Sequence, residues 1–386
     1  MKKETHKILL WLALLFSSVQ VFAQPPRGPY VRSPQVHDDQ TVTFSYLAPD
    51  AKSVLLDGDQ FGASNIPMTK DSIGIWSITV GPLKPDIYPY AFKVDGITVM
   101  DPANVDFFPN ERFKASLVDV PGDKPLMHAL QNVPHGTITY EYYPSVEGST
   151  GQLVVYTPPG YNKDAAKKYP VYYLISGTTD TEEDFFKVAR VNFIMDNMIA
   201  EGKAKPMIIV MPYGNPIARI AEQTGGPKPN DVMNRDSEDA IKRLKFFETD
   251  LITNVIPYVE NSYRVIPNGE NRAIGGFSRG GGQTLRAAFN NMGTFEYVCS
   301  YASYISPSEL ESNYGELINN HTKTNNQLKL LWSGIGTEDF LYKGTTEFNQ
   351  FLIDHKIELK TYETDGGHTW MNVKKYLNQT LPLLFK

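Results

Sequence analysis

A serine in a glycine-rich motif is the feature of this sequence most typical of a catalytic site. Residues 276–280 read Gly-Phe-Ser-Arg-Gly, a G-x-S-x-G pattern that also occurs by chance. Its context is more specific, because a strand-like run precedes Ser278 and a helical pattern follows it. Glycines allow a strand and a helix to pass closely around a sharp, strained turn. The pattern therefore predicts that Ser278 is a nucleophile near a helix N-terminus, the alternative being a glycine-rich turn with an idle serine.

A serine is a weak nucleophile until a base removes its proton, and three histidines follow Ser278 in the chain. His321 lies in a polar stretch that predicts a surface loop, and His355 lies in a helical pattern that predicts an exposed position. His368 lies in a glycine-rich segment directly after a strand-like run. Loops at the carboxyl ends of parallel strands meet at one sheet edge, so His368 is predicted to be the base.

The acid that orients this histidine should lie between Ser278 and His368 in the chain. Residues 328–332 predict a strand, and residues 333–339 predict the loop that follows it. Glu338 and Asp339 both qualify, and their spacing does not separate them. Either one could instead be a surface acid or a helix cap.

Acyl transfer also needs two N–H donors for the oxyanion that forms on the carbonyl. One donor is predicted to be the backbone N–H of Arg279, the residue after the nucleophile. The second is predicted in the loop 176–179, after the first strand of the same domain, with Thr178 as the donor.

The part of the chain before these candidate site residues has a different hydrophobic periodicity. Residues 24–118 contain short runs that alternate in period two, such as 41–46 and 76–80, separated by glycine and proline. Asp95-Gly96 between two such runs is a strong signal for a tight hairpin. This part of the chain predicts a small antiparallel β-sandwich of immunoglobulin-like type.

Residues 119–135 are rich in proline and predict a linker, and residues 136–386 predict an α/β-hydrolase domain. Continuous apolar runs, typical of buried parallel strands, occur at residues 171–175, 207–211, 272–277 and 328–332. Helical patterns lie between them, at residues 185–201, 236–263 and 345–355. Alternation of strands and helices predicts a mostly parallel sheet with helices on both faces.

The N-terminus has the anatomy of a secretory signal peptide. Three lysines precede the apolar run 8–16, and small residues follow, which predicts cleavage after residue 23. The apolar run is shorter than the ~20 residues that a membrane span needs. We therefore expect an exported protein, periplasmic or secreted, without a membrane span.

Composition narrows the class of ligand. A formal charge of −6 argues against nucleic acid as a partner, because phosphate binding needs clustered lysine and arginine. The one cysteine, Cys299, lies in an apolar run and is predicted to be a buried thiol. No His/Cys or Asp-rich spacing is typical of a metal site, and no metal or organic cofactor is predicted.

From residue 134 to the C-terminus the chain resembles carbohydrate esterase family 1, which contains feruloyl and acetylxylan esterases and is similar to the enterochelin-esterase group. The motifs that carry the resemblance are Val155-Tyr156-Thr157-Pro158-Pro159-Gly160-Tyr161, Gly276 to Thr284, Gly336-Thr337-Glu338-Asp339 and Gly367-His368-Thr369-Trp370. The resemblance implies that Asp339 is the acid.

Two positions depart from the family pattern, since Ser176-Gly177 replaces His-Gly and Arg279 replaces a frequent methionine. The N-terminal β domain resembles family 48 carbohydrate-binding modules. That resemblance rests on residues 67–70, 74–76 and 101–104.

The resemblance implies a serine carboxylic-ester hydrolase acting on plant cell-wall polysaccharide, with ferulate or a related hydroxycinnamate released from arabinoxylan. Deacetylation of xylan is the nearest alternative. Hydrolysis of a siderophore ester is a second, disfavoured by the net negative charge because ferric catecholate complexes are anionic. A third is a glycan-binding protein with a silent hydrolase domain. Residues 214–235 are expected to wall the substrate pocket.

Overall fold

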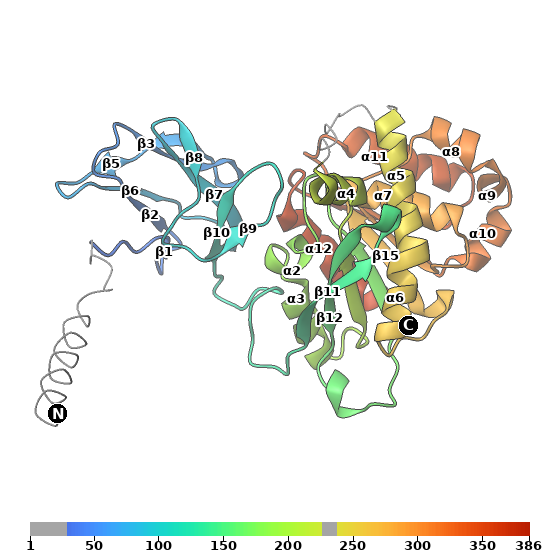
Figure 1. Ribbon diagram of the computed structural model, residues 1–386. Helices are drawn as coiled ribbons and strands as arrows, with labels where there is room; N and C mark the ends of the chain where they lie inside the picture. The colour runs from blue at the N-terminus through green and yellow to red at the C-terminus, as the bar shows by residue number, and fades with distance from the viewer. Residues whose placement is uncertain (1–28, 226–237) are drawn as a thin grey trace, which may run out of the picture.

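The computed structural model describes residues 29–225 and 238–386, which form three β-sheets with helices around the third (Figure 1). The predicted signal peptide and part of the predicted pocket wall lie outside the described residues. Within the described ranges, no helix is both long and apolar enough to cross a membrane.

Two antiparallel sheets form the first part of the chain, here called the N-terminal sheets (residues 35–120). One sheet has the order β1-β2-β6-β5, and the other has the order β4-β3-β7-β10-β9 with β8 beside β7. The strands are β1 (Gln35–Val36), β2 (Val42–Leu47), β3 (Val54–Gly58), β4 (Ala63–Pro67), β5 (Thr69–Lys70), β6 (Ile75–Val80), β7 (Asp86–Val94), β8 (Ile97–Val99), β9 (Phe107–Phe108) and β10 (Ala115–Val120). Asp95-Gly96 forms the predicted hairpin between β7 and β8. Two antiparallel sheets fit the predicted small β domain, and its immunoglobulin-like type stays a prediction.

An eight-stranded sheet forms the centre of the remaining chain, in the order β11-β12-β14-β13-β15-β16-β17-β18. The strands are β11 (Thr137–Pro144), β12 (Thr150–Thr157), β13 (Val171–Ile175), β14 (Ile208–Pro212), β15 (Arg272–Phe277), β16 (Tyr297–Tyr301), β17 (Leu330–Gly336) and β18 (Lys360–Thr364). Pairing is antiparallel from β11 to β14 and parallel from β14 to β18. The predicted mostly parallel sheet is therefore present.

Helices cover both faces of this sheet because successive strand residues point to opposite faces and both sets are apolar. The α-helices are α2 (Asp184–Lys187), α3 (Val191–Ala200), α4 (Pro216–Thr224), α5 (Glu238–Asp250), α6 (Ile256–Ser262), α7 (Arg279–Asn290), α8 (Pro307–Asn313), α9 (Gly315–Asn319), α10 (His321–Gln327), α11 (Tyr342–Asp354) and α12 (Trp370–Thr380). One core lies under α3 and α12, and a second lies under α5, α6, α7 and α11.

The observed elements differ from the predicted ones in four places. The helix predicted over 185–201 is broken before Val191, because Arg190 has a left-handed φ of 54°. The helix predicted over 236–263 changes to a π-helical turn at Leu251–Val255 and ends at Ser262. His321 begins a helix instead of lying in a loop, since Asn320 caps that helix with its side chain. The strand before Asp339 continues to Gly336, four residues into the predicted loop.

The N-terminal sheets pack directly against the α/β part, with β9 and β10 on the side that faces α2 and α12 (Figure 1). Ile87, Phe108 and Leu117 belong to the same buried core as residues of α3 and α12. Lys374, whose side chain is 2% exposed, forms an ion pair with Asp86 across this boundary. The N-terminal sheets therefore have a core of their own and also contribute residues to the core of the α/β part.

Candidate active site

Ser278 lies at the turn between β15 and α7, in the middle of the eight-stranded sheet. Its backbone has φ 56° and ψ −119°, a combination that is strained for any residue with a side chain. The glycines on either side are required sterically. A Cβ atom on Gly276 would lie 2.4 Å from the carbonyl carbon of Gly280, and one on Gly280 would lie 2.2 Å from the carbonyl oxygen of Ile175. These residues therefore form a sharp turn that presents the hydroxyl of Ser278.

His368 and Asp339 form a hydrogen-bonded pair at the carboxyl ends of the neighbouring strands β17 and β18. The distance from Nδ1 of His368 to Oδ2 of Asp339 is 2.7 Å. The Asp339 side chain is fully buried, whereas the His368 side chain is 17% exposed. An ionised carboxylate only accepts hydrogen bonds, so Nδ1 carries the proton and Nε2 is left as the basic nitrogen. Asp339 also accepts the backbone N–H of Leu341 through Oδ1, at 2.8 Å.

The choice between the two adjacent acids, open on spacing alone, is clear in the geometry. Glu338 is exposed, and its backbone N–H donates to the carbonyl oxygen of Gly366 at 3.1 Å. This bond joins the acid loop to the histidine loop. Asp339, the next residue, is turned inward toward His368.

Phe277 connects the serine turn with the histidine loop. Its ring stacks on the imidazole of His368, with 4.5 Å between the ring centroids and 29° between the ring planes. Phe340 lies against the same imidazole at 4.6 Å and is 72% exposed. The imidazole of His368 therefore contacts one ring from the serine turn and one ring from the acid loop.

The predicted oxyanion loop, residues 176–179, follows β13 and lies beside the serine. A Cβ atom added to Gly177 would be 3.4 Å from Cβ of Ser278. The N–H of Gly177 donates to the carboxylate of Asp180 at 3.2 Å. Thr178 is exposed, and no protein group in the described ranges accepts its backbone N–H. The geometry therefore keeps Thr178 available as a donor and not Gly177.

Arg279 is the first residue of α7, and its side chain turns toward the oxyanion loop. One guanidinium nitrogen donates to the carbonyl oxygen of Gly177 at 3.0 Å. This bond ties the oxyanion loop to the first turn of α7.

A group of buried acids lies directly behind the oxyanion loop. Burial raises the pKa of Asp180 to about 7, an effect that the nearby Arg279 guanidinium opposes. Burial and the neighbouring Asp180 raise the pKa of Asp184 well above its ordinary value. Because Asp180 has a cationic neighbour, the charge of this pair is best placed on Asp180 and the proton on Asp184.

Asp180, Phe277 and Asn110 were not among the site residues predicted from the sequence. Asn110 belongs to the N-terminal sheets and contacts Asp180. The position of Asp180, three residues after Gly177, was a weak local signal. Asn110 lies 70 positions away from Asp180 and had none.

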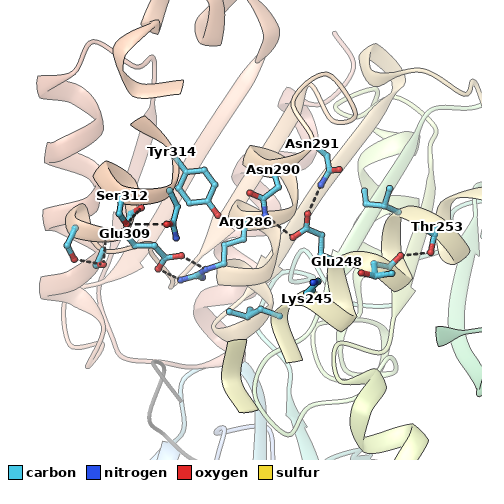
Figure 2. Close-up of a pocket in the computed structure, with 15 residues that line it drawn as sticks. Lys245, Glu248, Thr253, Arg286, Asn290, Asn291, Glu309, Ser312 and Tyr314 are labelled. Atoms are coloured by element: carbon cyan, nitrogen blue, oxygen red, sulfur yellow. Dashed lines mark hydrogen bonds and ion pairs between the residues drawn. The ribbon is translucent and has the colours of Figure 1, made fainter. Parts of the chain in front are cut away.

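A groove of about 850 Å³ lies elsewhere, between α5, α7 and α8 (Figure 2). Several polar groups of its lining bind one another, since Arg286 is paired with Glu309, and Glu248 accepts from Asn290 and Asn291. Neither Ser278, Asp339 nor His368 lines it. Arg286 lies eight residues along α7 from Ser278, about 12 Å at the rise of a helix, so this groove is not the reaction centre.

Two relatives with described activities match most of the chain. An endo-1,4-beta-xylanase/feruloyl esterase from Xylanibacter ruminicola is 30% identical over 296 residues, which are 74% of this chain and 38% of the relative. Endo-1,4-beta-xylanase Y from Acetivibrio thermocellus is 26% identical over 276 residues, 65% of this chain and 23% of the relative. The chain thus spans well under half the length of these relatives.

Solved structures share the fold. A ferulic acid esterase from the anaerobic fungus Anaeromyces mucronatus has a TM-score of 0.54 at 23% identity, with 68% of this chain and 96% of that chain covered. The enterobactin esterase from Shigella flexneri has a TM-score of 0.61 at 15% identity, with 89% and 93% covered.

A family match covers the region that holds all the residues described above except those of the N-terminal sheets. Residues 147–382 match the family described as "Putative esterase". That range contains the serine turn, the acid loop, the histidine loop and the oxyanion loop. The chain therefore belongs to this esterase family.

Proposed function

We propose that the protein is a serine carboxylic-ester hydrolase that releases ferulate or a related hydroxycinnamate from plant cell-wall polysaccharide. The observation that carries the proposal is the hydrogen-bonded pair of His368 and Asp339 beside the strained turn of Ser278. A nucleophile, a base and a buried acid on three loops at one sheet edge are the parts that acyl transfer needs.

The proposed reaction begins with attack of the Ser278 hydroxyl oxygen on the ester carbonyl carbon. Nε2 of His368 takes the hydroxyl proton, and the buried Asp339 carboxylate stabilises the imidazolium. The C–O bond to the sugar then breaks, and His368 gives its proton to the departing alkoxide. Water, deprotonated by His368, attacks the acyl-serine carbonyl carbon. The bond from that carbon to the Ser278 oxygen breaks, His368 returns its proton to this oxygen, and the carboxylic acid is released.

Two backbone N–H groups would stabilise the oxyanion in both steps, from Arg279 and from Thr178. Arg279 is the first residue of α7, where N–H groups point toward the serine turn and the positive end of the helix dipole favours negative charge. Thr178 is exposed on the loop that lies beside Ser278. Removing one such donor typically costs about 10²–10³ in kcat.

An aromatic acyl group fits the surroundings of His368 better than an acetyl group does. Phe340 is 72% exposed and contacts the imidazole, so it offers a flat apolar face at the site of reaction. Stacking of a hydroxycinnamoyl ring on such a face contributes about 0.5–1.5 kcal/mol beyond area burial. The described activity of the Xylanibacter ruminicola relative points to the same substrate class.

Hydrolysis rates on methyl ferulate and on acetylated xylan test this substrate proposal. We expect kcat/KM for methyl ferulate to exceed kcat/KM per acetyl group of acetylated xylan. Phe340→Ala should reduce only the kcat/KM for methyl ferulate. Ser278→Ala, which lacks the proposed nucleophile, is the inactive control for both substrates. A preference for acetylated xylan would replace the proposal with deacetylation, and cleavage of ferric enterobactin alone would replace it with siderophore hydrolysis.

We further propose that the protein is exported. The basic, apolar and small residues of segment 1–23 support export.

We also propose that the N-terminal sheets are a family-48-like carbohydrate-binding module. Trp76, Tyr88 and Tyr90 are buried in the core of the N-terminal sheets and are not free to bind sugar. Mass spectrometry of the mature N-terminus tests export, and retardation of the protein in xylan-containing gels tests sugar binding.

A further inference from the structure

One segment of the N-terminal sheets is paired with the oxyanion loop of the hydrolase part. Asn110, just after β9, forms an antiparallel bridge with Asp180. The backbone N–H of Glu111 donates to the carbonyl oxygen of Thr179 at 2.8 Å. In Figure 1, β9 lies on the side of the N-terminal sheets that faces α2, the helix that follows this loop.

The Asp180 carboxylate joins the two sides of this contact. Oδ1 accepts the side-chain amide of Asn110 at 2.9 Å, and Oδ2 accepts the backbone N–H of Gly177 at 3.2 Å. Asn110 is 3% exposed and Asp180 is 6% exposed, so water does not compete for these bonds. The Asn110 oxygen accepts the N–H of Arg112 at 2.9 Å, which fixes the amide with its NH₂ group toward Asp180.

The loop is therefore held on both sides of Thr178. Gly177 is fixed through Asp180, and Thr179, whose φ is 64°, is fixed by Glu111. A donor aimed at an oxyanion must keep its position to within about 0.5 Å, because a misplacement of about 1 Å can cost 10²-fold in rate.

We propose that Asn110 is a positioning residue for ester hydrolysis, which acts through Asp180 to hold the Thr178 N–H in place beside Ser278. The N-terminal sheets are then part of the catalytic apparatus and not only a substrate-binding attachment. This inference rests on the proposed esterase function, although it does not depend on which acyl group is cleaved.

Asn110→Ala in the full chain tests the proposal with 4-nitrophenyl acetate, a substrate too small to reach the N-terminal sheets. We expect kcat to fall about 10- to 100-fold, with KM changed less than about twofold, because an oxyanion donor acts on the transition state. Asn104→Ala is the matched control. Its amide is also partly buried in the N-terminal sheets, donating to Tyr90 and to the Leu117 carbonyl oxygen, and does not contact the loop.

Coupling to Asp180 separates positioning from general destabilisation. In an Asp180→Ala background, Asn110→Ala should cause less than about a twofold further loss, because residues that act through one another are non-additive. Equal losses of kcat in Asn110→Ala and Asn104→Ala, or full additivity with Asp180→Ala, would overturn the proposal.

Hydrogen exchange is a second measurement that does not depend on activity. It tests the positioning role even if the alanine variants fold poorly or the protein is not an esterase. Hydrogen exchange of the peptide over residues 176–182 should accelerate in Asn110→Ser and not in Asn104→Ser, and unchanged exchange in Asn110→Ser would refute the positioning role. If the wild type cleaves 4-nitrophenyl acetate and not methyl ferulate, only the feruloyl substrate is wrong. If it cleaves no ester, the esterase proposal fails, and the exchange result still decides whether Asn110 holds the loop.

Discussion

Replacing Asp339 by asparagine changes only the hydrogen-bonding roles at the centre of the proposed mechanism, because the side chain keeps its shape. In the structure both carboxylate oxygens accept, Oδ2 from His368 at 2.7 Å and Oδ1 from the Leu341 backbone N–H at 2.8 Å. Asparagine has one accepting oxygen and one NH₂ group that donates. The Leu341 N–H can only donate, so it draws the asparagine oxygen to its own side.

The NH₂ group of the introduced asparagine would then face Nδ1 of His368, which must accept and so lose its proton. The imidazole proton moves to Nε2, the nitrogen that has to receive the proton of Ser278. The fold is kept and the base is disabled. We expect kcat to fall about 10⁴-fold, equivalent to about 5.5 kcal/mol in the activation barrier.

The measurement is hydrolysis of 4-nitrophenyl acetate by Asp339→Asn and by Glu338→Gln, with melting temperatures as a check on folding. Glu338 is the matched control because it is the adjacent acid, is exposed and contributes its backbone to the histidine loop. We expect Glu338→Gln to keep nearly full activity. Retention of more than about a tenth of the activity by folded Asp339→Asn, or an equal loss in Glu338→Gln, would show that Asp339 is not the acid that orients His368.

Three further outcomes are expected. Ser278→Ala should fold normally and lose activity by several orders of magnitude, up to about 10⁶-fold, and substantial residual turnover on an aryl ester would exclude Ser278 as the nucleophile. As the pH rises from about 4 toward neutrality, the wild type should lose stability relative to Asp184→Asn, which resembles the protonated acid. The raised pKa of Asp184 contributes stability that is present below its unfolded pKa and lost as the folded group ionises, so a difference in melting temperature that does not change with pH would contradict the assignment. A chain of residues 119–386 should aggregate when expressed alone, and a soluble fragment with the full-length rate on 4-nitrophenyl acetate would show that the N-terminal sheets are dispensable.

The sequence predicted those features that depend on local pattern. Continuous apolar runs identified strands such as β13 and β15, and the glycines around Ser278 indicated the sharp turn, because only glycine fits at 2.2–2.4 Å from neighbouring backbone. The order of serine, acid and histidine pointed to two loops that the parallel sheet brings to one edge. Where local geometry overrides periodicity, prediction was wrong, as at Arg190, whose left-handed backbone divides one predicted helix into two.

Contacts between distant segments were not predictable in the same way. Asn110 and Asp180 are ordinary polar residues in ordinary loops, and their bond exists only because the N-terminal sheets dock at one place on the α/β part. The ion pair of Asp86 with the buried Lys374 spans 288 positions and has no periodic signal. Docking depends on the summed shape of two surfaces, which single-sequence patterns do not encode.

The packing explains why the N-terminal sheets should not be separable from the reaction centre. Phe108 packs against Trp370, Trp370 against Phe277, and Phe277 against the imidazole of His368, with centroid distances of 6.4, 5.3 and 4.5 Å. Each aromatic contact contributes about 0.5–1.5 kcal/mol, and all but the last lie within one buried core. Removing the sheets would expose Trp370 and leave Lys374 without its carboxylate partner.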